Sequence, residues 1–487
     1  MRLSYLFKSN RLSLACLTLC VFTYSLPVLA QQEILEGRLD AVFGDPRPGS
    51  GETGRQLLFL TEDNGDMTEL TVSPELLHRN GDFFTWNGKR VRVHLRSKTN
   101  ELALPAMRPQ SRQAAALMLL DLDSAHQALG APSAARLAGT FPWVSILCKF
   151  SDVSAEPRDL AYFQDMYANT PGGTDHFWRE VSYDQVNVAG SIAIDWVTLP
   201  KARVEYILND GADLSLLFND CTAAADPYVD FAADGGYSGI NMMFNADLDC
   251  CAWGGRRSAT LDGLRKVWRV TWEPPWGYAK VAVIAHEMGH GFGLPHSNNF
   301  DGDSSPYDSP WDVMSSTSRY AVSDPDYSIR GKHVNAYAKY RLEWISGAQL
   351  LEVGPDTVVT ATIDALATPS TANYRMARIP ISGSDEYYTV EVRKRFGDYD
   401  GALPSNAVII HHVVPGRSEP SWALDIDQPP ANYGDNEGTM FRVGELFNDE
   451  ANQISISIDA ETTNGFVVTL ATTVEPTDPL IFKDAFE

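Results

Sequence analysis

Eleven residues, His286 to His296, hold one glutamate and three histidines at spacings that suit a metal ion. The stretch HEMGHGFGLPH follows the apolar run VAVIA, and no Gly or Pro interrupts it before Gly289, so we expect a helix here. On a helix, His286 and His290 lie four residues apart and present their rings on one face. Glu287 is rotated by about 100° from that face. This takes it out of the ligand set but leaves it close to a water on the same metal.

The two glycines that follow are expected to end the helix. Gly293 in particular can take the positive φ that turns the chain sharply after Gly291. The turn brings His296 back as a third ligand. Three neutral imidazoles suit zinc and leave one tetrahedral position open, which is the arrangement of a catalytic zinc. A structural zinc with Asp301 or Asp303 as fourth ligand is one alternative, and a buried helix with three ordinary histidines is another.

The chemistry that these residues predict is hydrolysis of an amide bond. Zinc lowers the pKa of a bound water from about 15.7 to about 7, and Glu287 would take its proton and pass it to the leaving nitrogen. We therefore expect a zinc-dependent endopeptidase. Two alternatives stay open: an inactive metalloprotease-fold protein with a binding or adhesion role, which the intact Glu287 argues against, and a zinc amidohydrolase acting on a non-protein amide, because pocket shape selects the substrate.

The wider pattern resembles a known clan of proteases. HExxHxxGxxH, completed by Met314 in SPWDVMS eighteen residues after His296, is similar to the metzincin zinc proteases with their methionine turn. NAYAKYRLEWI at 335–345 and EYYTVEVRKRFGDYDGALPSNAVIIHHV at 386–413 resemble the gametolysin-like and immune-inhibitor-A-like secreted families. The resemblance covers about residues 141–470. It implies an α+β catalytic domain, in which a mixed β-sheet and helices carry the zinc-binding helix and the methionine turn, followed by a β-rich domain.

Two features depart from these families. No cysteine occurs between Ala30 and Cys148, so a propeptide cysteine cannot be the group that blocks zinc. Astacin-like members carry a tyrosine two residues after the methionine, whereas this chain has Ser316 there, so we assign no such ligand.

The chain divides into five predicted segments: a signal peptide at 1–30, a small β-rich domain with a linker at 31–135, the zinc protease domain at 136–347, a β-sandwich-like domain at 348–473 and a tail at 474–487. The linker is the Ala-, Gln- and Pro-containing stretch from about 102 to 139, with one helix expected in it. The 31–135 region is either a removable propeptide or a permanent accessory domain. As a propeptide it would have to block zinc sterically or with an oxygen ligand.

The N-terminus and the net charge bear on location and partners. A basic start, an apolar stretch over Leu12–Leu29 and Ala30 at the cleavage position are typical of a secretory signal, with an uncleaved anchor as the alternative. The net charge is −24, and losing Arg2, Lys8 and Arg11 with the signal makes it −27. Such acidity disfavours nucleic acid and anionic membranes as partners. We expect a secreted protein whose partners are protein or peptide substrates.

Four cysteines remain after the signal: Cys148, Cys221, Cys250 and Cys251. An exported chain with an even number favours disulfides over a thiolate zinc site. We expect the adjacent Cys250 and Cys251 to have separate partners, because neighbours do not easily bond in ordinary backbone geometry.

Three weaker signals complete the picture. NNFDGDSSPYD at 298–308 is rich in oxygen ligands and predicts either a calcium site or a solvated loop. KVWRVTW at 266–272 alternates as a strand does, and is either the strand along which a substrate pairs or an ordinary amphipathic strand. His411 and His412 lie in an apolar strand and should face opposite ways, so we expect no metal there.

Overall fold

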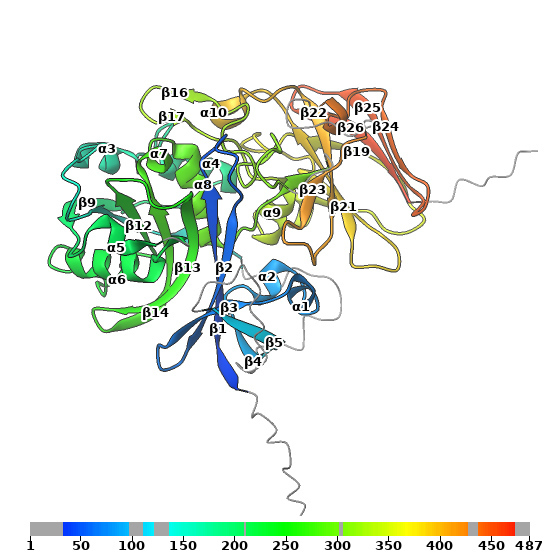
Figure 1. Ribbon diagram of the computed structural model, residues 1–487. Helices are drawn as coiled ribbons and strands as arrows, with labels where there is room; N and C mark the ends of the chain where they lie inside the picture. Colours follow the sequence, from blue (N-terminus) through cyan, green and yellow to red (C-terminus); the bar gives the residue numbers. More distant parts are fainter. Residues whose placement is uncertain are drawn as a thin grey trace, which may run out of the picture.

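The computed structural model describes residues 33–96, 111–120, 136–208, 211–300, 305–426 and 437–472. A ten-stranded sheet runs through its N-terminal and central parts, in the order β2-β3-β5-β4-β1-β13-β14-β12-β7-β9 (Figure 1). Its strands are β1 (Ile34–Pro46), β2 (Arg55–Glu62), β3 (Met67–Thr71), β4 (Lys89–Leu95), β5 (Arg112–Leu119), β7 (Trp143–Lys149), β9 (Ile192–Thr198), β12 (Gly239–Phe244), β13 (Cys251–Leu261) and β14 (Leu264–Glu273).

The helices and shorter strands of the first three hundred residues connect this sheet. The helices are α1 (Pro74–His78), α2 (Phe83–Trp86), α3 (Leu160–Asp165), α4 (Thr174–Ser182), α5 (Arg203–Tyr206), α6 (Leu214–Ala225), α7 (Pro275–Tyr278) and α8 (Val281–Phe292). The short strands are β6 (Gly139–Thr140), β8 (Val186–Asn187), β10 (Ile207–Leu208), β11 (Gly211–Ala212) and β15 (Asn298–Asn299).

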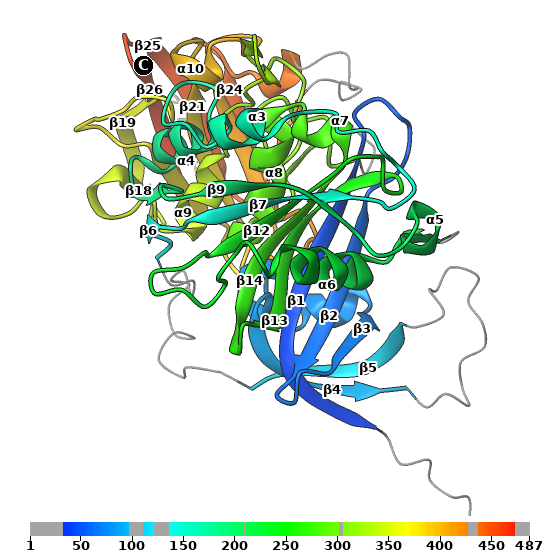
Figure 2. The same ribbon diagram turned by 90° about the vertical axis from the view of Figure 1, so that its left-hand side faces the viewer.

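The central part of the sheet is covered on both faces because its strands are apolar on both. In β7, Trp143 and Leu147 pack with α3, α4 and α8, whereas Ile146 and Cys148 pack with α6. This is the alternation of a strand buried on both sides. Figure 2 shows α6 on one side of these strands and α3, α4 and α8 on the other. β9, β7, β12 and β14 run parallel, and only β13 at their edge is antiparallel to its neighbour.

The N-terminal strands close into a small barrel, since β2, β3, β5, β4 and β1 form a ring through the β1–β2 pairing. β5 corrects the expectation of a linker with a helix: Arg112–Leu119 is a strand between β3 and β4. Its Ala-rich sequence favours a helix, but burying Ala114 and Leu117 in the barrel outweighs that weak preference. The signal peptide and the rest of the predicted linker, except Ser111, Leu120 and residues 136–139, lie outside the described residues.

The barrel and the central sheet share a strand. β1 is thirteen residues long: its first half pairs with β4, and Val42–Pro46 pairs antiparallel with β13 of the central sheet. One strand thus belongs to both the barrel and the central sheet.

The C-terminal part consists of two packed sheets, ordered β15-β23-β22-β21-β20-β18 and β19-β26-β25-β24, around one apolar core. Its elements are β16 (Ser323–Asp324), β17 (Ser328–Ile329), α9 (Ala336–Arg341), η2 (Gly347–Gln349), β18 (Leu350–Glu352), β19 (Val358–Asp364), β20 (Met376–Pro380), β21 (Tyr387–Arg393), α10 (Gly397–Asp400), β22 (Ala407–Val413), β23 (Ser421–Ala423), η3 (Glu437–Thr439), β24 (Leu446–Asp449), β25 (Ile454–Glu461) and β26 (Gly465–Ala471). In the described part of the chain no helix is long and apolar enough to cross a bilayer. The predicted tail at 474–487 lies outside the described residues.

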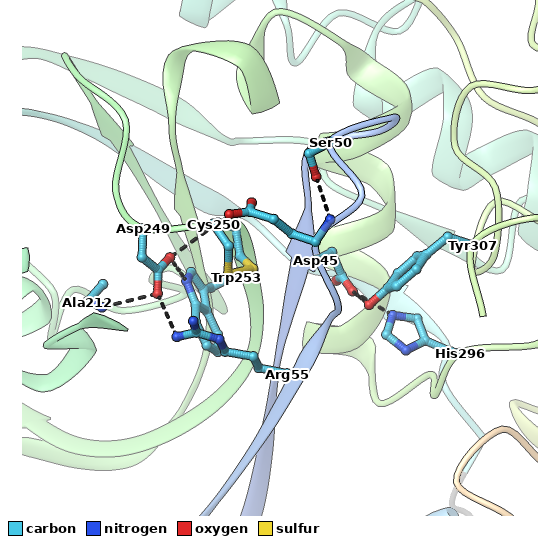
Figure 3. Close-up of a disulfide and its surroundings, with 11 residues drawn as sticks. Asp45, Ser50, Arg55, Ala212, Asp249, Cys250, Trp253, His296 and Tyr307 are labelled. Atoms are coloured by element: carbon cyan, nitrogen blue, oxygen red, sulfur yellow. Dashed lines mark hydrogen bonds and ion pairs between the residues drawn. A yellow bond between two sulfur atoms is a disulfide. The ribbon is translucent and has the colours of Figure 1, made fainter. Parts of the chain in front are cut away.

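The four described cysteines form two disulfides, Cys148–Cys221 and Cys250–Cys251. The second corrects our expectation that adjacent cysteines have separate partners. Cys148 of β7 and Cys221 of α6 both lie in the core between these two elements and bond to each other. Cys250 and Cys251 are then left to bond to one another. Asp249 holds the turn at the vicinal pair by accepting hydrogen bonds from the Cys251 and Trp253 nitrogens (Figure 3).

Candidate metal centre

The three histidines converge on one point beside strands β1 and β13. The Nε2 atoms of His286 and His290 are 3.1 Å apart, and each lies 3.2 Å from Nε2 of His296. Tetrahedral ligands at about 2.0–2.1 Å from zinc are separated by about 3.3 Å. The triangle of nitrogens therefore has the dimensions of three corners of a tetrahedral zinc site.

Backbone carbonyls set the orientation of two of the rings. His286 donates from Nδ1 to the Val313 carbonyl at 2.7 Å, and His290 donates from Nδ1 to the Leu294 carbonyl at 2.8 Å. A neutral imidazole with its proton on Nδ1 has a lone pair on Nε2. Burial lowers the pKa of His290 to about 3, so this ring is neutral. Lone pairs facing each other at such distances repel unless a metal ion or a shared proton lies between them, and this donor set fits zinc.

The turn after α8 and the segment around Met314 build the walls of the site. Gly293 ends α8 with a φ of +95°, a conformation that a residue with a Cβ rarely adopts. Met314 is buried beneath the helix, where a Cβ on Gly289 would come to 2.5 Å from its sulfur. Because the neighbouring Val313 carbonyl holds His286, the Met314 turn positions a predicted ligand directly.

The fourth corner of the tetrahedron is taken by Asp45 from β1, which corrects the expectation of a position without a protein ligand. Its Oδ2 lies 3.1 Å from His286 Nε2 and 3.2 Å from His290 Nε2, and its Oδ1 lies 2.8 Å from His296 Nε2. The sequence gives no hint of this, because Asp45 precedes His286 by 241 residues and follows no ligand spacing. Asp301 and Asp303, the predicted alternatives, lie outside the described residues.

Three buried carboxylates surround the histidines: Asp45, Glu273 and Glu287. No donor among the described residues reaches either oxygen of Glu273 or Glu287. Burial, together with the negative charge of Asp45 and Glu273, raises the pKa of Glu287 well above its ordinary value. Buried carboxylates without donors are costly unless a positive charge compensates them. This is a second, independent fit between the site and a divalent cation.

Tyr307 is a further residue that sequence reasoning missed. Its hydroxyl donates to Oδ1 of Asp45 at 2.8 Å, next to the His296 ring (Figure 3). Hollows lie on both sides of this contact. One of about 260 Å³ borders His286 and Glu287, and another of about 490 Å³ borders His296. Loop residues between β1 and β2 line part of each hollow. The only signal for Tyr307 in the sequence is its place between the third histidine and the Met314 turn.

The C-terminal sheets contact the backbone next to the Met314 turn. Arg393 of β21 is fully buried and donates to the Trp311 carbonyl, three residues before Met314, as well as to Asp400. Glu391 on the same strand accepts a hydrogen bond from the Ala336 backbone. Arg393, in the VEVRKR stretch quoted above, thus joins β21 to the backbone beside the Met314 turn, and Glu391 joins it to the start of α9.

The structure gives the positions of residues that four further expectations from the sequence concern. KVWRVTW lies in β14, which pairs with β13 along this stretch and with β12 from Arg269 onward, so from Arg269 on both sides of the strand are already paired. His411 is buried and His412 is partly exposed, on opposite faces of β22 and far from the other histidines in sequence. Ser316 donates its backbone N–H to the Ser309 carbonyl, and its hydroxyl accepts a hydrogen bond from the Arg319 backbone. Of the predicted calcium loop, residues 301–304 are not described, and Asn298–Asn299 form a buried strand beside β23.

A scan of the chain against protein-family models gives no match, and a search of curated proteins gives none.

Proposed function

We propose that this chain is a secreted zinc-dependent endopeptidase and that its central part is a metzincin-like catalytic domain. The observation that carries the proposal is the triangle of Nε2 atoms from His286, His290 and His296 with the buried Glu287 beside it. A mixed sheet in which β13 runs antiparallel to β14, together with α8 and the turn at Met314, is consistent with that fold. Two disulfides are consistent with export.

Each residue of the proposed site has its own chemical role. His286, His290 and His296 would hold zinc, which supplies Lewis acidity and lowers the pKa of a water. The Glu287 carboxylate accepts the proton of the attacking water and returns it to the leaving nitrogen. The Tyr307 hydroxyl, which now donates to an Asp45 oxygen, can donate to a substrate oxygen that takes the same place and stabilise the charge developing on it.

A second candidate function rests on Asp45. Four protein ligands are typical of a structural zinc, so a binding protein with a permanently closed site is the rival. This second function does not explain the burial of Glu287 beside the three histidines. Glu287 is outside the proposed ligand set, and no donor among the described residues reaches its carboxylate.

The test compares the chain with its Glu287→Gln variant on an unfolded protein substrate, with zinc content measured in both. We expect both to hold one zinc and the variant to lose about 10²–10⁴ in turnover, because only the proton acceptor is gone. A chelator should abolish hydrolysis and added zinc should restore it. The proposal is wrong if the purified chain and its Asp45→Ala variant both contain zinc and neither of them cleaves peptide bonds.

A further inference from the structure

The hollow of about 260 Å³ beside Glu287 has two kinds of lining. Val283 of α8 and Trp276 of α7 contribute apolar surface. The stretch 315–318, which directly follows the Met314 turn, contributes three serines and a threonine, and we call it the serine wall. A space with apolar and hydroxyl-bearing surfaces suits a large side chain with an apolar body and a polar tip, such as tyrosine.

A buried lysine holds the serine wall. Lys332 lies between β17 and α9 and is fully buried, and its ammonium donates a hydrogen bond to the Ser316 carbonyl. Two further hydrogen bonds of Ser316 stay within its own loop. Its backbone N–H donates to the Ser309 carbonyl at 3.3 Å, and its hydroxyl accepts from the Arg319 backbone at 3.2 Å. Lys332 therefore ties this loop to a segment outside it.

The segment that carries Lys332 is itself fixed on both sides of the lysine. Gly331 has a φ of +87°, and a Cβ on it would lie 3.3 Å from the Val313 side chain, so the chain passes close to the residue before Met314. On the other side, the His333 backbone N–H donates to the Asp400 carboxylate at 3.1 Å. The ammonium thus has a defined place from which to hold the wall.

Lys332 is poorly suited to stabilising the fold. Burial and the like charges of Arg393 and Arg319 lower the pKa of Lys332 to about 7, although Asp312 and Asp400 act to raise it. Replacing buried ionic groups by apolar residues of similar size often leaves the stability of a protein unchanged or raises it. The main consequence of this lysine is therefore the position of the carbonyl that it holds.

We propose that the Lys332 ammonium is a positioning group which, by holding the Ser316 carbonyl, fixes the serine wall and makes the hollow select a tyrosine-sized substrate side chain next to the scissile bond. The proposal rests on the proposed endopeptidase function, because it assigns the hollow to one residue of a peptide. Without the ammonium, the wall is free to move and the hollow accepts small and large side chains more equally.

The test compares Lys332→Met, which removes the charge and the donor but nearly keeps the length, with Lys394→Met. Lys394 is the matched control because it is also buried and donates to a backbone carbonyl, that of Thr462, but is not among the described residues that line the hollow. Both variants are made in whichever of the full chain and its Asp45→Ala form cleaves an unfolded protein. The substrates are peptide pairs that differ only by Tyr or Ala, either before or after the cut, and the pair that the parent discriminates more strongly is used.

The measured quantity is the ratio of kcat/KM for the Tyr peptide over the Ala peptide, in which the steps common to both cancel. We expect this ratio to fall about tenfold in Lys332→Met, because the fit of one side chain in a pocket is worth about 10–200-fold. In Lys394→Met it should stay within about twofold of the parent, even if the chain unfolds at lower urea. If Lys332→Met misfolds by circular dichroism, Lys332→Gln replaces it and should give an intermediate ratio, since its amide still donates. An unchanged ratio in the Lys332 variant overturns the proposal.

The pH profile of the same ratio tests the charge itself. In the parent the ratio should fall between pH 6 and pH 8.5, because the lysine loses its proton near its pKa of about 7 and then holds the carbonyl more weakly. In Lys332→Met the ratio should be low and constant over this range. A parent profile as flat as that of the variant overturns the role of the ammonium.

A binding measurement separates this inference from the proposed function. Calorimetry gives the Kd of both peptides for the Glu287→Gln chain, with and without Lys332→Met. If no form of the chain cleaves a peptide, but the Tyr peptide binds more tightly and Lys332→Met abolishes that preference, the positioning role stands and the protease assignment fails. If the chain cleaves peptides and Lys332→Met leaves both preferences unchanged, the protease assignment stands and the positioning role fails. Equal binding of the two peptides, together with equal cleavage, also overturns the positioning role.

Discussion

Replacing Arg393 with Met tests whether the C-terminal sheets hold the metal centre. Arg393 is fully buried, donates to both carboxylate oxygens of Asp400 and reaches the Trp311 carbonyl beside the Met314 turn. Removing one partner of a buried ion pair costs about 3–5 kcal/mol, because the other charge stays buried without compensation. That is a large part of the ordinary stability of about 5–15 kcal/mol. We expect the variant to unfold, and to release zinc, at clearly lower urea.

The assay is a urea titration in which zinc release is followed with a chromophoric chelator and unfolding by tryptophan fluorescence. Arg395→Met is the matched control, because Arg395 lies two residues further along and is exposed. A surface substitution of this kind should stay within about 0.5 kcal/mol of the parent. The double variant Arg393→Met/Asp400→Asn should recover about 1 kcal/mol or more, since it no longer buries a lone charge.

The pH dependence has a defined sign. Although burial opposes it, the Arg393 guanidinium holds the pKa of Asp400 below its ordinary value. A carboxyl whose pKa is lower in the folded state stabilises the fold above its unfolded pKa and loses that contribution as the pH falls through the folded value. The variant lacks this contribution, so its deficit should stay constant between pH 7 and pH 4 and shrink as the pH falls below the ordinary aspartate value of about 3.9. An Arg393→Met chain that unfolds with the Arg395→Met control, or a double variant with strictly additive losses, refutes the reasoning.

Three further substitutions probe the site itself. Gly254→Ala should keep zinc but reduce turnover and destabilise the chain by about 1–3 kcal/mol, because its Cβ meets the Glu287 backbone. Gly354→Ala is the control, since its Cβ would meet nothing closer than 3.7 Å; equal behaviour of the two variants contradicts the close approach. His296→Ala should weaken zinc by more than the roughly 10–100-fold typical of losing an outer partner, and a variant that still retains zinc against a chelator shows that His296 is not a ligand. Tyr307→Phe should lose about 10²–10³ in kcat with little change in KM; an unchanged kcat removes its hydroxyl from the reaction.

Local sequence was sufficient to predict the part of the site that lies within α8 and the turn that follows it. The helix at 281–292, the left-handed Gly293 and the positions of His286 and His290 depend on contacts a few residues apart, where spacing and backbone preference decide. The same holds for strongly apolar strands such as β7 and β12, which are buried on both faces.

Contacts between distant segments decided everything else. Asp45 reaches the histidines only because β1 adds to the edge of β13, and strand pairing of this kind leaves no periodic trace in either segment. The same is true of β5, whose Ala-rich sequence became a strand once the barrel offered it two neighbours. The histidine spacing by itself predicted a metal site here, because side chains on one helix and its following turn are placed by local geometry. Only the tertiary structure decided what occupies the fourth corner, because that depends on which strand fills the sheet edge.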